Sequence, residues 1–303
     1  MDDISFYDLM QKQVKSKFKG KTKLRCRIAL HYKENAEREY ARLLFSYVRI
    51  AKEVLKLYFP EIKAAYFAEV GGAVQYREDD KRSLIQKIED TFSKMGIDLY
   101  DKISRFQLEK KIDGIATQAG KLSVKEWKKV VNSTLGIDIM DDYYLGEFFR
   151  QQMNVWTTDN VNLIKSLPND ALTDMRQIMK QGFLSGKTLT DIVAEIEHTY
   201  HVSRSKAKFL ARDQMAKLNS DLAQAQQRDA GITEYEWSSS QDGRVRDSHR
   251  ELNGKRFRWD EPPIVDKKTG RRAHPGQDYQ CRCVALPVFD IDTLNLPLGG
   301  KRK

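Results

Sequence analysis

Cysteine is scarce in this sequence, and its scarcity excludes one class of fold. Three cysteines among 303 residues cannot form the disulfide framework of a small secreted protein. Two of them lie two positions apart, as Cys281 and Cys283, which favours a metal site or simple packing over a structural disulfide. Cys26 stands alone among basic residues and is expected to be an ordinary thiol.

Long apolar runs and a secretory leader are lacking as well. No stretch approaches the roughly 18 consecutive apolar residues that a membrane-spanning helix needs. The sequence starts with Met1, Asp2 and Asp3, an acidic start without the apolar region of a signal peptide. We therefore expect a protein that is made and kept in the cytoplasm and that has no membrane partner.

The chain does contain enough apolar residues for a core, together with an excess of basic charge. Hydrophobic residues make up 40% of the sequence and aromatic residues 10%, which excludes wholesale disorder. Lys and Arg number 53 against 43 Asp and Glu, a net charge of +10. This balance favours polyanions or acidic protein surfaces as partners, although most such charge lies on an ordinary solvated surface.

Proline divides the chain into two parts with different patterns. Five of the seven prolines lie after residue 260, whereas the residues upstream follow helical spacing. The clearest apolar stripe covers residues 40–58 at steps of three and four, and it predicts a long helix that Pro60 stops. Weaker amphipathic patterns predict further helices over 80–95 and 99–115.

The segment 168–231 predicts three more helices. Asn169 or Asp170 can cap the first of them. Residues 188–191, Thr-Leu-Thr-Asp, resemble a capping box at the start of the second. The third starts after Ser203 and continues to the glycine that closes the segment.

After these helices the spacing changes to alternation. Tyr235 and Trp237 alternate with glutamates, as in a half-buried strand, and residues 257–259 indicate a second strand. Over residues 281–288 the two thiols alternate with aliphatic side chains, so both thiols are expected on one face of a third strand.

Together these patterns predict an α+β fold that is mainly α. A helical body is followed by a small β-rich C-terminal module that a zinc ion could hold together. The expected division is a helical N-terminal region of unassigned role (1–160), a second helical part (161–231), the β-rich Cys/His module (232–290) and a basic tail (291–303).

The candidate metal ligands are His249, His274, Cys281 and Cys283. Two of the five histidines and two of the three cysteines fall within 35 residues, and four such ligands would complete a tetrahedral zinc site. A metal would stabilise a β-module that has little core of its own. The spacing departs from the usual cysteine pair, so two surface histidines and a thiol pair that merely packs remain an alternative.

The order of several sequence blocks resembles one known family. The blocks are VSRSKAKFLARDQMAKLN (202–219), GITEYEW (231–237), DGRVRDSH (242–249), LNGK (252–255) and HPGQDYQCRC (274–283). In this order they resemble the Mu F-like phage head morphogenesis proteins, the minor head or minor capsid proteins of tailed phages and prophages. The resemblance covers about residues 160–290 and does not reach the first 150 residues.

The resemblance also bears on the metal. Many members of the family carry Cys-x-x-Cys where this chain has Arg246 to His249, followed by His-Pro and Cys-Arg-Cys. Arg246 cannot ligate a metal, but His249 is a competent substitute for the second cysteine. The resemblance therefore implies a structural zinc ion on His249, His274, Cys281 and Cys283.

For function, the resemblance implies a structural virion component that acts in head assembly and is not an enzyme. Its expected partners are the portal protein and the major capsid or scaffold protein, with double-stranded DNA contacted through its phosphates without sequence specificity. Its expected location is the virion head, and the host cytoplasm during assembly. Asp242 and Arg244 also belong to the family pattern, and such a pair is expected to fix a loop conformation.

Two other classes of function remain alternatives. His249, Asn253 and His274 would suit a metal-dependent, HNH-like nuclease, but two thiols would fill the coordination of the cation and leave no position for water or phosphate. The segment 189–230 could belong to a DNA-binding regulator, although its basic residues are spread around the helix and interrupted by acidic ones.

Overall fold

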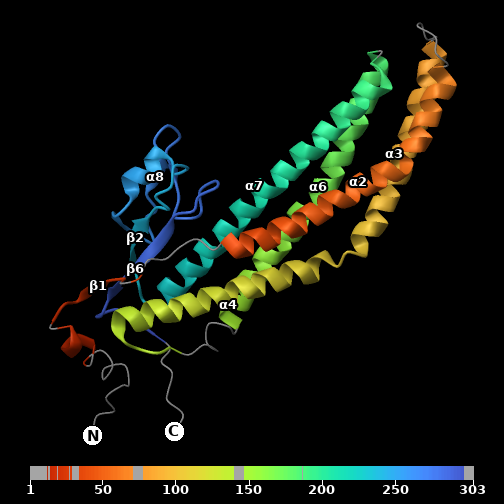
Figure 1. Cartoon of the computed structure of the whole chain (residues 1–303). Helices are drawn as coiled ribbons and strands as arrows, with labels where there is room; N and C mark the ends of the chain where they lie inside the picture. The colour runs from red at the N-terminus through yellow and green to blue at the C-terminus, as the bar shows by residue number, and fades with distance from the viewer. Residues whose placement is uncertain are drawn as a thin grey trace. The chain divides into compact units, whose positions relative to one another are not determined.

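The computed structural model describes residues 12–296, apart from positions 13, 19, 27, 29–33, 71–77, 140–146 and 186. Figure 1 shows the helices and strands along the chain. The described residues form two compact units, each assembled from separate stretches of the chain. Unit 1 holds the described residues of Met1–Glu37, Ile115–Trp156 and Arg212–Lys303, and unit 2 holds those of Arg38–Gly114 and Thr157–Ala211.

Long helices make up most of the described chain. The helices are α2 (Glu34–Val70), α3 (Glu78–Ser104), α4 (Leu108–Leu135), α6 (Glu147–Leu184), α7 (Leu189–Asp229) and α8 (Asp247–Leu252). The strands are β1 (Lys23–Arg25), β2 (Glu234–Ser238), β3 (Arg256–Arg258), β4 (Ile264–Asp266), β5 (Arg271–Arg272) and β6 (Val284–Asp290). The predicted class, mainly α with a small β-rich C-terminal part, is confirmed.

Three predicted helix boundaries are wrong, because the helices are longer than local signals indicate. Pro60 lies inside α2, which continues and buries Ile62 at 1% exposure. Pro168 lies inside α6, and Ser203 lies inside α7. An interior proline costs a helix roughly 3 kcal/mol. In α2 the buried apolar face continues beyond the proline, and this tertiary packing offsets the cost.

Other helix ends follow from local chemistry. Gln107 separates α3 from α4, and its φ of 51° cannot continue a right-handed helix, so the single helix predicted over 99–115 is wrong and its residues are divided between α3 and α4. Thr188 Oγ1 accepts the N–H of Asp191 at 3.2 Å, which confirms the predicted cap of α7. Beyond the end of α7, Gly231 has φ +74°, and a Cβ at this position would collide with the carbonyl oxygen of Thr293. This turn therefore requires glycine.

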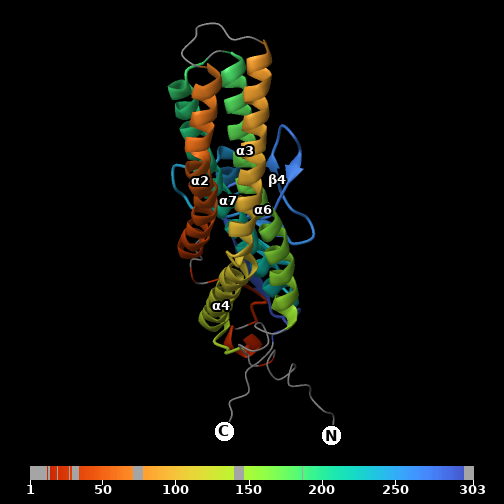
Figure 2. The same ribbon diagram turned by 90° about the vertical axis from the view of Figure 1, so that its right-hand side faces the viewer.

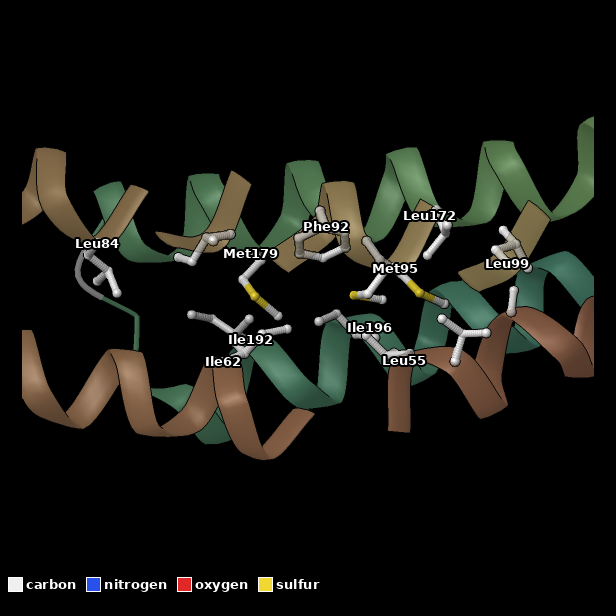
Figure 3. Close-up of a cluster of buried hydrophobic side chains, with 14 residues drawn as sticks. Leu55, Ile62, Leu84, Phe92, Met95, Leu99, Leu172, Met179, Ile192 and Ile196 are labelled. Atoms are coloured by element: carbon white, nitrogen blue, oxygen red, sulfur yellow. The ribbon is translucent and has the colours of Figure 1, made fainter. Parts of the chain in front are cut away.

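The core of unit 2 lies among α2, α3, α6 and α7, whose labelled ribbons run together in Figure 2. Each helix turns an apolar face inward, and the side chains interleave along the bundle (Figure 3). Because isolated helices gain little from propensity alone, this shared burial is what stabilises them. The cluster comprises Ala51, Val54, Leu55, Ile62, Leu84, Ile88, Phe92, Met95, Leu99, Leu172, Met175, Met179, Ile192 and Ile196.

Unit 1 contains an antiparallel sheet with the strand order β1-β6-β2-β3, and a smaller pair of β4 and β5. The strands predicted around Tyr235 and Phe257 are confirmed as β2 and β3. The two thiols precede β6 instead of lying within it. They join the aromatic residues in one buried cluster of Tyr235, Trp237, Trp259, Val265, Ala273, Cys281, Cys283 and Ala285.

Candidate metal centre

The candidate metal centre is built from α8 and from the loop that leads into β6, both in unit 1. His249 lies on α8, whereas Cys281 and Cys283 lie in the loop. The loop turns at Asp278, whose carbonyl oxygen accepts the N–H of Cys281 at 3.1 Å, and at Gln280, which has φ 54°. This turn directs both thiols inward, and all three side chains belong to residues that are at most 5% exposed.

The three side chains bring one nitrogen and two sulfur atoms together. His249 Nδ1 lies 3.5 Å from Cys281 Sγ and 3.7 Å from Cys283 Sγ. Adjacent N and S ligands of a tetrahedral zinc ion lie roughly 3.5–3.8 Å apart, as follows from bond lengths of about 2.0–2.3 Å. Among the residues that the structure describes, this Cys/His cluster of His249, Cys281 and Cys283 is a group that could hold a metal ion.

Asp278 completes the surroundings of the Cys/His cluster. Its Oδ2 lies 3.0 Å from His249 Nε2 and accepts a hydrogen bond from Arg246 at 3.1 Å, and its Oδ1 lies 3.1 Å from a guanidinium nitrogen of Arg271. The carboxylate holds the imidazole so that Nδ1 faces the thiols, as a carboxylate behind a metal-bound histidine does. The hydrogen bond from Arg246 helps to hold this carboxylate in place.

The sequence patterns did not single out Asp278. A lone aspartate carries little information in a sequence with this many charged residues, and the side chain is 1% exposed only because the loop folds over it. Its place three residues before Cys281, inside the block 274–283, is the one signal that could have drawn attention to it.

Electrostatics within the cluster favours a charged pair. Burial lowers the pKa of His249, but the hydrogen bond to Asp278 and the Cys281 thiol outweigh it and raise the pKa to about 9. A hydrogen bond from Cys283, together with His249, holds the pKa of Cys281 well below its usual range despite burial. The neighbouring Cys281 sulfur and burial raise the pKa of Cys283. These directions favour a negative charge on the Cys281 sulfur beside a positive His249 ring, with the remaining thiol proton on Cys283.

His274, the fourth predicted ligand, has partners of its own. It is buried, its Nδ1 lies 2.9 Å from the hydroxyl oxygen of Tyr235, and its ring also hydrogen-bonds the backbone of Trp259. The Trp259 ring lies 4.8 Å away, and burial lowers the pKa of His274. The structure thus brings three of the four predicted ligands together and holds His274 in separate hydrogen bonds.

A cavity of about 90 Å³ opens beside the Cys/His cluster. Asp242 lines it, accepting the backbone N–H of Arg244 at 3.0 Å and its guanidinium at 2.8 Å, so this pair fixes the loop as predicted. Asn253 of the nuclease alternative is engaged elsewhere, since its Oδ1 accepts the N–H of Ser239 at 2.8 Å. The basic residues that line the cavity are Arg212, Arg244, Arg246, Arg282 and His249.

Comparison with known proteins finds a family model that matches the part of the chain holding this centre. Residues 173–286 match the sequence model of the family described as Phage Mu protein F like protein. This part of the chain is therefore similar to the Mu F-like proteins. The resemblance expected from the sequence blocks is thereby confirmed, and the Cys/His cluster lies entirely inside the matched residues.

Two relatives extend the similarity beyond this region. An uncharacterized protein of Haemophilus influenzae is 32% identical over 195 residues, which cover 64% of this chain. The chain spans only 42% of the length of that relative. The minor head protein GP7 of Bacillus phage SPP1 is 22% identical over 239 residues, covering 69% of this chain and 77% of that protein. No solved structure matches. Among the helices that the structure describes, none has an apolar stretch that could cross a membrane.

Proposed function

We propose that the protein is a minor head protein of a tailed phage or prophage and acts in head assembly. The observation that carries the proposal is the similarity to the minor head protein of Bacillus phage SPP1, which covers 69% of this chain. The match to the Mu F-like family model covers only residues 173–286, whereas the similarity to the SPP1 minor head protein covers a larger part of the chain.

In this proposal the Cys/His cluster holds a structural zinc ion. His249, Cys281 and Cys283 supply the ligands, and His274 supplies the fourth after exchanging its hydrogen bond with Tyr235 for the metal. A bound zinc ion would cross-link α8 to the loop before β6. That link matters because this part of unit 1 has a small hydrophobic core.

The proposed partners are the portal protein and the major capsid or scaffold protein, in the virion head and, during assembly, in the host cytoplasm. Unit 2 offers apolar side chains for such contacts, since Leu57, Ile97 and Tyr100 are 64%, 71% and 77% exposed. The net charge of +10 supports additional contact with the phosphates of double-stranded DNA. We assign the protein no catalytic activity.

The role in assembly is tested by making phage with the Cys281→Ser variant and, as the matched control, the Cys26→Ser variant. Cys26 lies outside the Cys/His cluster, and its Sγ donates to the carbonyl oxygen of Ile28 at 3.2 Å. We expect wild-type protein in purified virions and in complexes with portal or procapsid, and reduced infectivity only with Cys281→Ser. Absence of the wild-type protein from virions and procapsids would contradict the proposed function.

Metal and DNA are tested on the purified protein. Zinc below about 0.2 ions per chain, with all thiols titrating freely, would contradict the zinc proposal. DNA affinity should fall steeply between low and physiological salt, and a site that survives excess random competitor would favour a regulator instead. Metal-dependent cleavage of DNA or RNA that is lost in His249→Ala would favour the nuclease.

A further inference from the structure

A cavity of about 310 Å³ lies inside unit 2 and is lined by residues of α2, α6 and α7. Its described lining shares no residue with the Cys/His cluster or with the arginine-lined cavity beside that cluster. The wall is mainly apolar and consists of Leu55, Phe59, Met175, Val193 and Ile196. Three of these five side chains belong to the buried core of unit 2, so the cavity extends down to that core.

Pro60 accounts for an opening at this place in α2. A proline inside a helix has no N–H for the carbonyl four residues earlier, and its ring pushes that carbonyl away. In α2 this carbonyl belongs to Lys56, and both residues line the cavity. The interruption of the helix and the cavity therefore coincide. A departure from local sequence rules of this kind is expected at functional or strained sites.

A space of this size beside core side chains favours an apolar occupant. Protein interiors are close-packed, with few voids larger than a water molecule. An engineered cavity of about 150 Å³ lined by aliphatic and aromatic side chains stays dry and binds benzene. The cavity of unit 2 is about 310 Å³, at the lower end of the roughly 300–1,000 Å³ of small-molecule sites. The fitting occupant is therefore a small molecule with an apolar body.

Charged side chains at the edge of the cavity select the polar end of such a molecule. Lys52 and Lys56 lie on the α2 side, half-buried and exposed, and Glu197 lies exposed on the α7 side. Among the described residues of the lining, two ammonium groups thus stand against one carboxylate. A negative head group on the α2 side gains from both lysines, whereas a positive one is repelled by them.

We propose that this cavity binds an unbranched aliphatic carboxylate of medium chain length. The chain packs against Leu55, Met175 and Ile196, and the carboxylate faces Lys52 and Lys56. A mostly apolar wall with a few polar groups that fix orientation is the usual composition of a ligand site. The proposal goes beyond the head-assembly function and is independent of it and of the metal centre, which belongs to unit 1.

The test follows the Met175 methyl signal in the full-length protein labelled with ¹³C-methyl-methionine, with the signal assigned by its loss in Met175→Leu. The probes are hexanoate, octanoate, 1-octanol and octylammonium, each below its micelle-forming concentration. We expect a saturable shift with octanoate and about tenfold weaker binding of hexanoate, because each buried CH₂ group strengthens binding by about three- to fourfold. The affinity should fall from octanoate to 1-octanol to octylammonium.

Charge variants separate the head group from the chain. Lys56→Gln should weaken octanoate binding by about two- to fivefold, and Glu197→Gln should strengthen it by a similar factor. Both should leave the affinity for 1-octanol unchanged, which a general loss of structure would not do. Lys102→Gln is the matched control, because it removes an exposed lysine of α3 outside the lining and should change neither affinity.

Val193→Phe fills the cavity from α7 and should abolish binding of octanoate and of 1-octanol. Urea unfolding establishes that the variant is folded, and the charge variants test the site without filling it. The proposal would be overturned by the absence of a saturable shift in the wild type or by octanoate binding that survives in folded Val193→Phe. Equal or tighter binding of 1-octanol or octylammonium than of octanoate would overturn it as well.

Discussion

Replacing Asp278 by asparagine tests whether its carboxylate organises the Cys/His cluster. The substitution keeps the shape but removes the charge that faces His249, Arg246 and Arg271. Breaking a fully buried ion pair costs about 3–5 kcal/mol. Here the side chain of Asp278 is 1% exposed, but those of the two arginines are 46% and 39% exposed and can return to water. We therefore expect the metal-free protein to lose about 1–3 kcal/mol of unfolding free energy.

The metal should respond more strongly than the fold. Removing the carboxylate behind a metal-bound histidine lowers metal affinity by about 10–100-fold. Competition between the protein and a chromogenic chelator measures zinc affinity, and urea unfolding of the metal-free protein measures stability. Asp260→Asn is the matched control, because Asp260 is an exposed aspartate of the same module paired with Arg258. This control should leave both quantities unchanged.

The pH dependence gives a second check on Asp278. Burial raises its pKa, but the hydrogen bond from His249 and the two guanidinium groups outweigh burial and hold the pKa below its usual value. Its stabilising contribution is therefore present above the unfolded-state pKa of about 4 and is lost as the pH falls through the lowered folded value. Wild type and Asp278→Asn should converge in acid. An unchanged zinc affinity in the variant at neutral pH would refute the role given to this carboxylate.

Three further outcomes are expected. Zinc binding at pH 7 should release about two protons, one each from His249 and Cys283, because the pKa values of both groups are raised. Zinc affinity should therefore fall as the pH falls. Calorimetry in buffers of different ionisation enthalpy counts the protons, and a count near zero would contradict this ligand set. Ile88→Ala should lower the unfolding free energy of unit 2, measured in urea, by about 2–5 kcal/mol and leave zinc affinity unchanged. A loss below about 1 kcal/mol would contradict the placement of Ile88 in the core. Gly231→Ala should lower the free energy of unfolding by about 2 kcal/mol or more. Gly243→Ala should leave it unchanged, because an added Cβ at that position meets nothing within 4 Å. Equal losses of stability in the two variants would refute the turn geometry.

The sequence predicts the helices better than their ends. Apolar residues at steps of three and four mark the faces that are buried in unit 2, so the existence of the helices follows from the pattern. Pro60, Pro168 and Ser203 predict boundaries because local signals of this kind usually end or start helices. The course of each helix depends on packing partners that are distant in the sequence, and no local window contains them.

The chemistry of the site was predictable in kind but not in arrangement. The clustering of His249, His274, Cys281 and Cys283 indicates metal ligands because few other functions gather these residue types. Which histidine faces the thiols depends on the side chains behind it. Asp278 turns one ring toward the sulfur atoms, and Tyr235 engages the other.

Strand β1 limits how the Mu F-like region could be transferred between related proteins by recombination. Its residues Lys23, Leu24 and Arg25 pair with Asp290, Phe289 and Val288 of β6, yet they lie far outside the matched residues 173–286. A Mu F-like region moved into another chain without this strand would expose the backbone of β6 along one edge, and open edges invite pairing between molecules. A viable recombinant must bring or find a substitute strand, so the early segment and the C-terminal region are constrained to be inherited together.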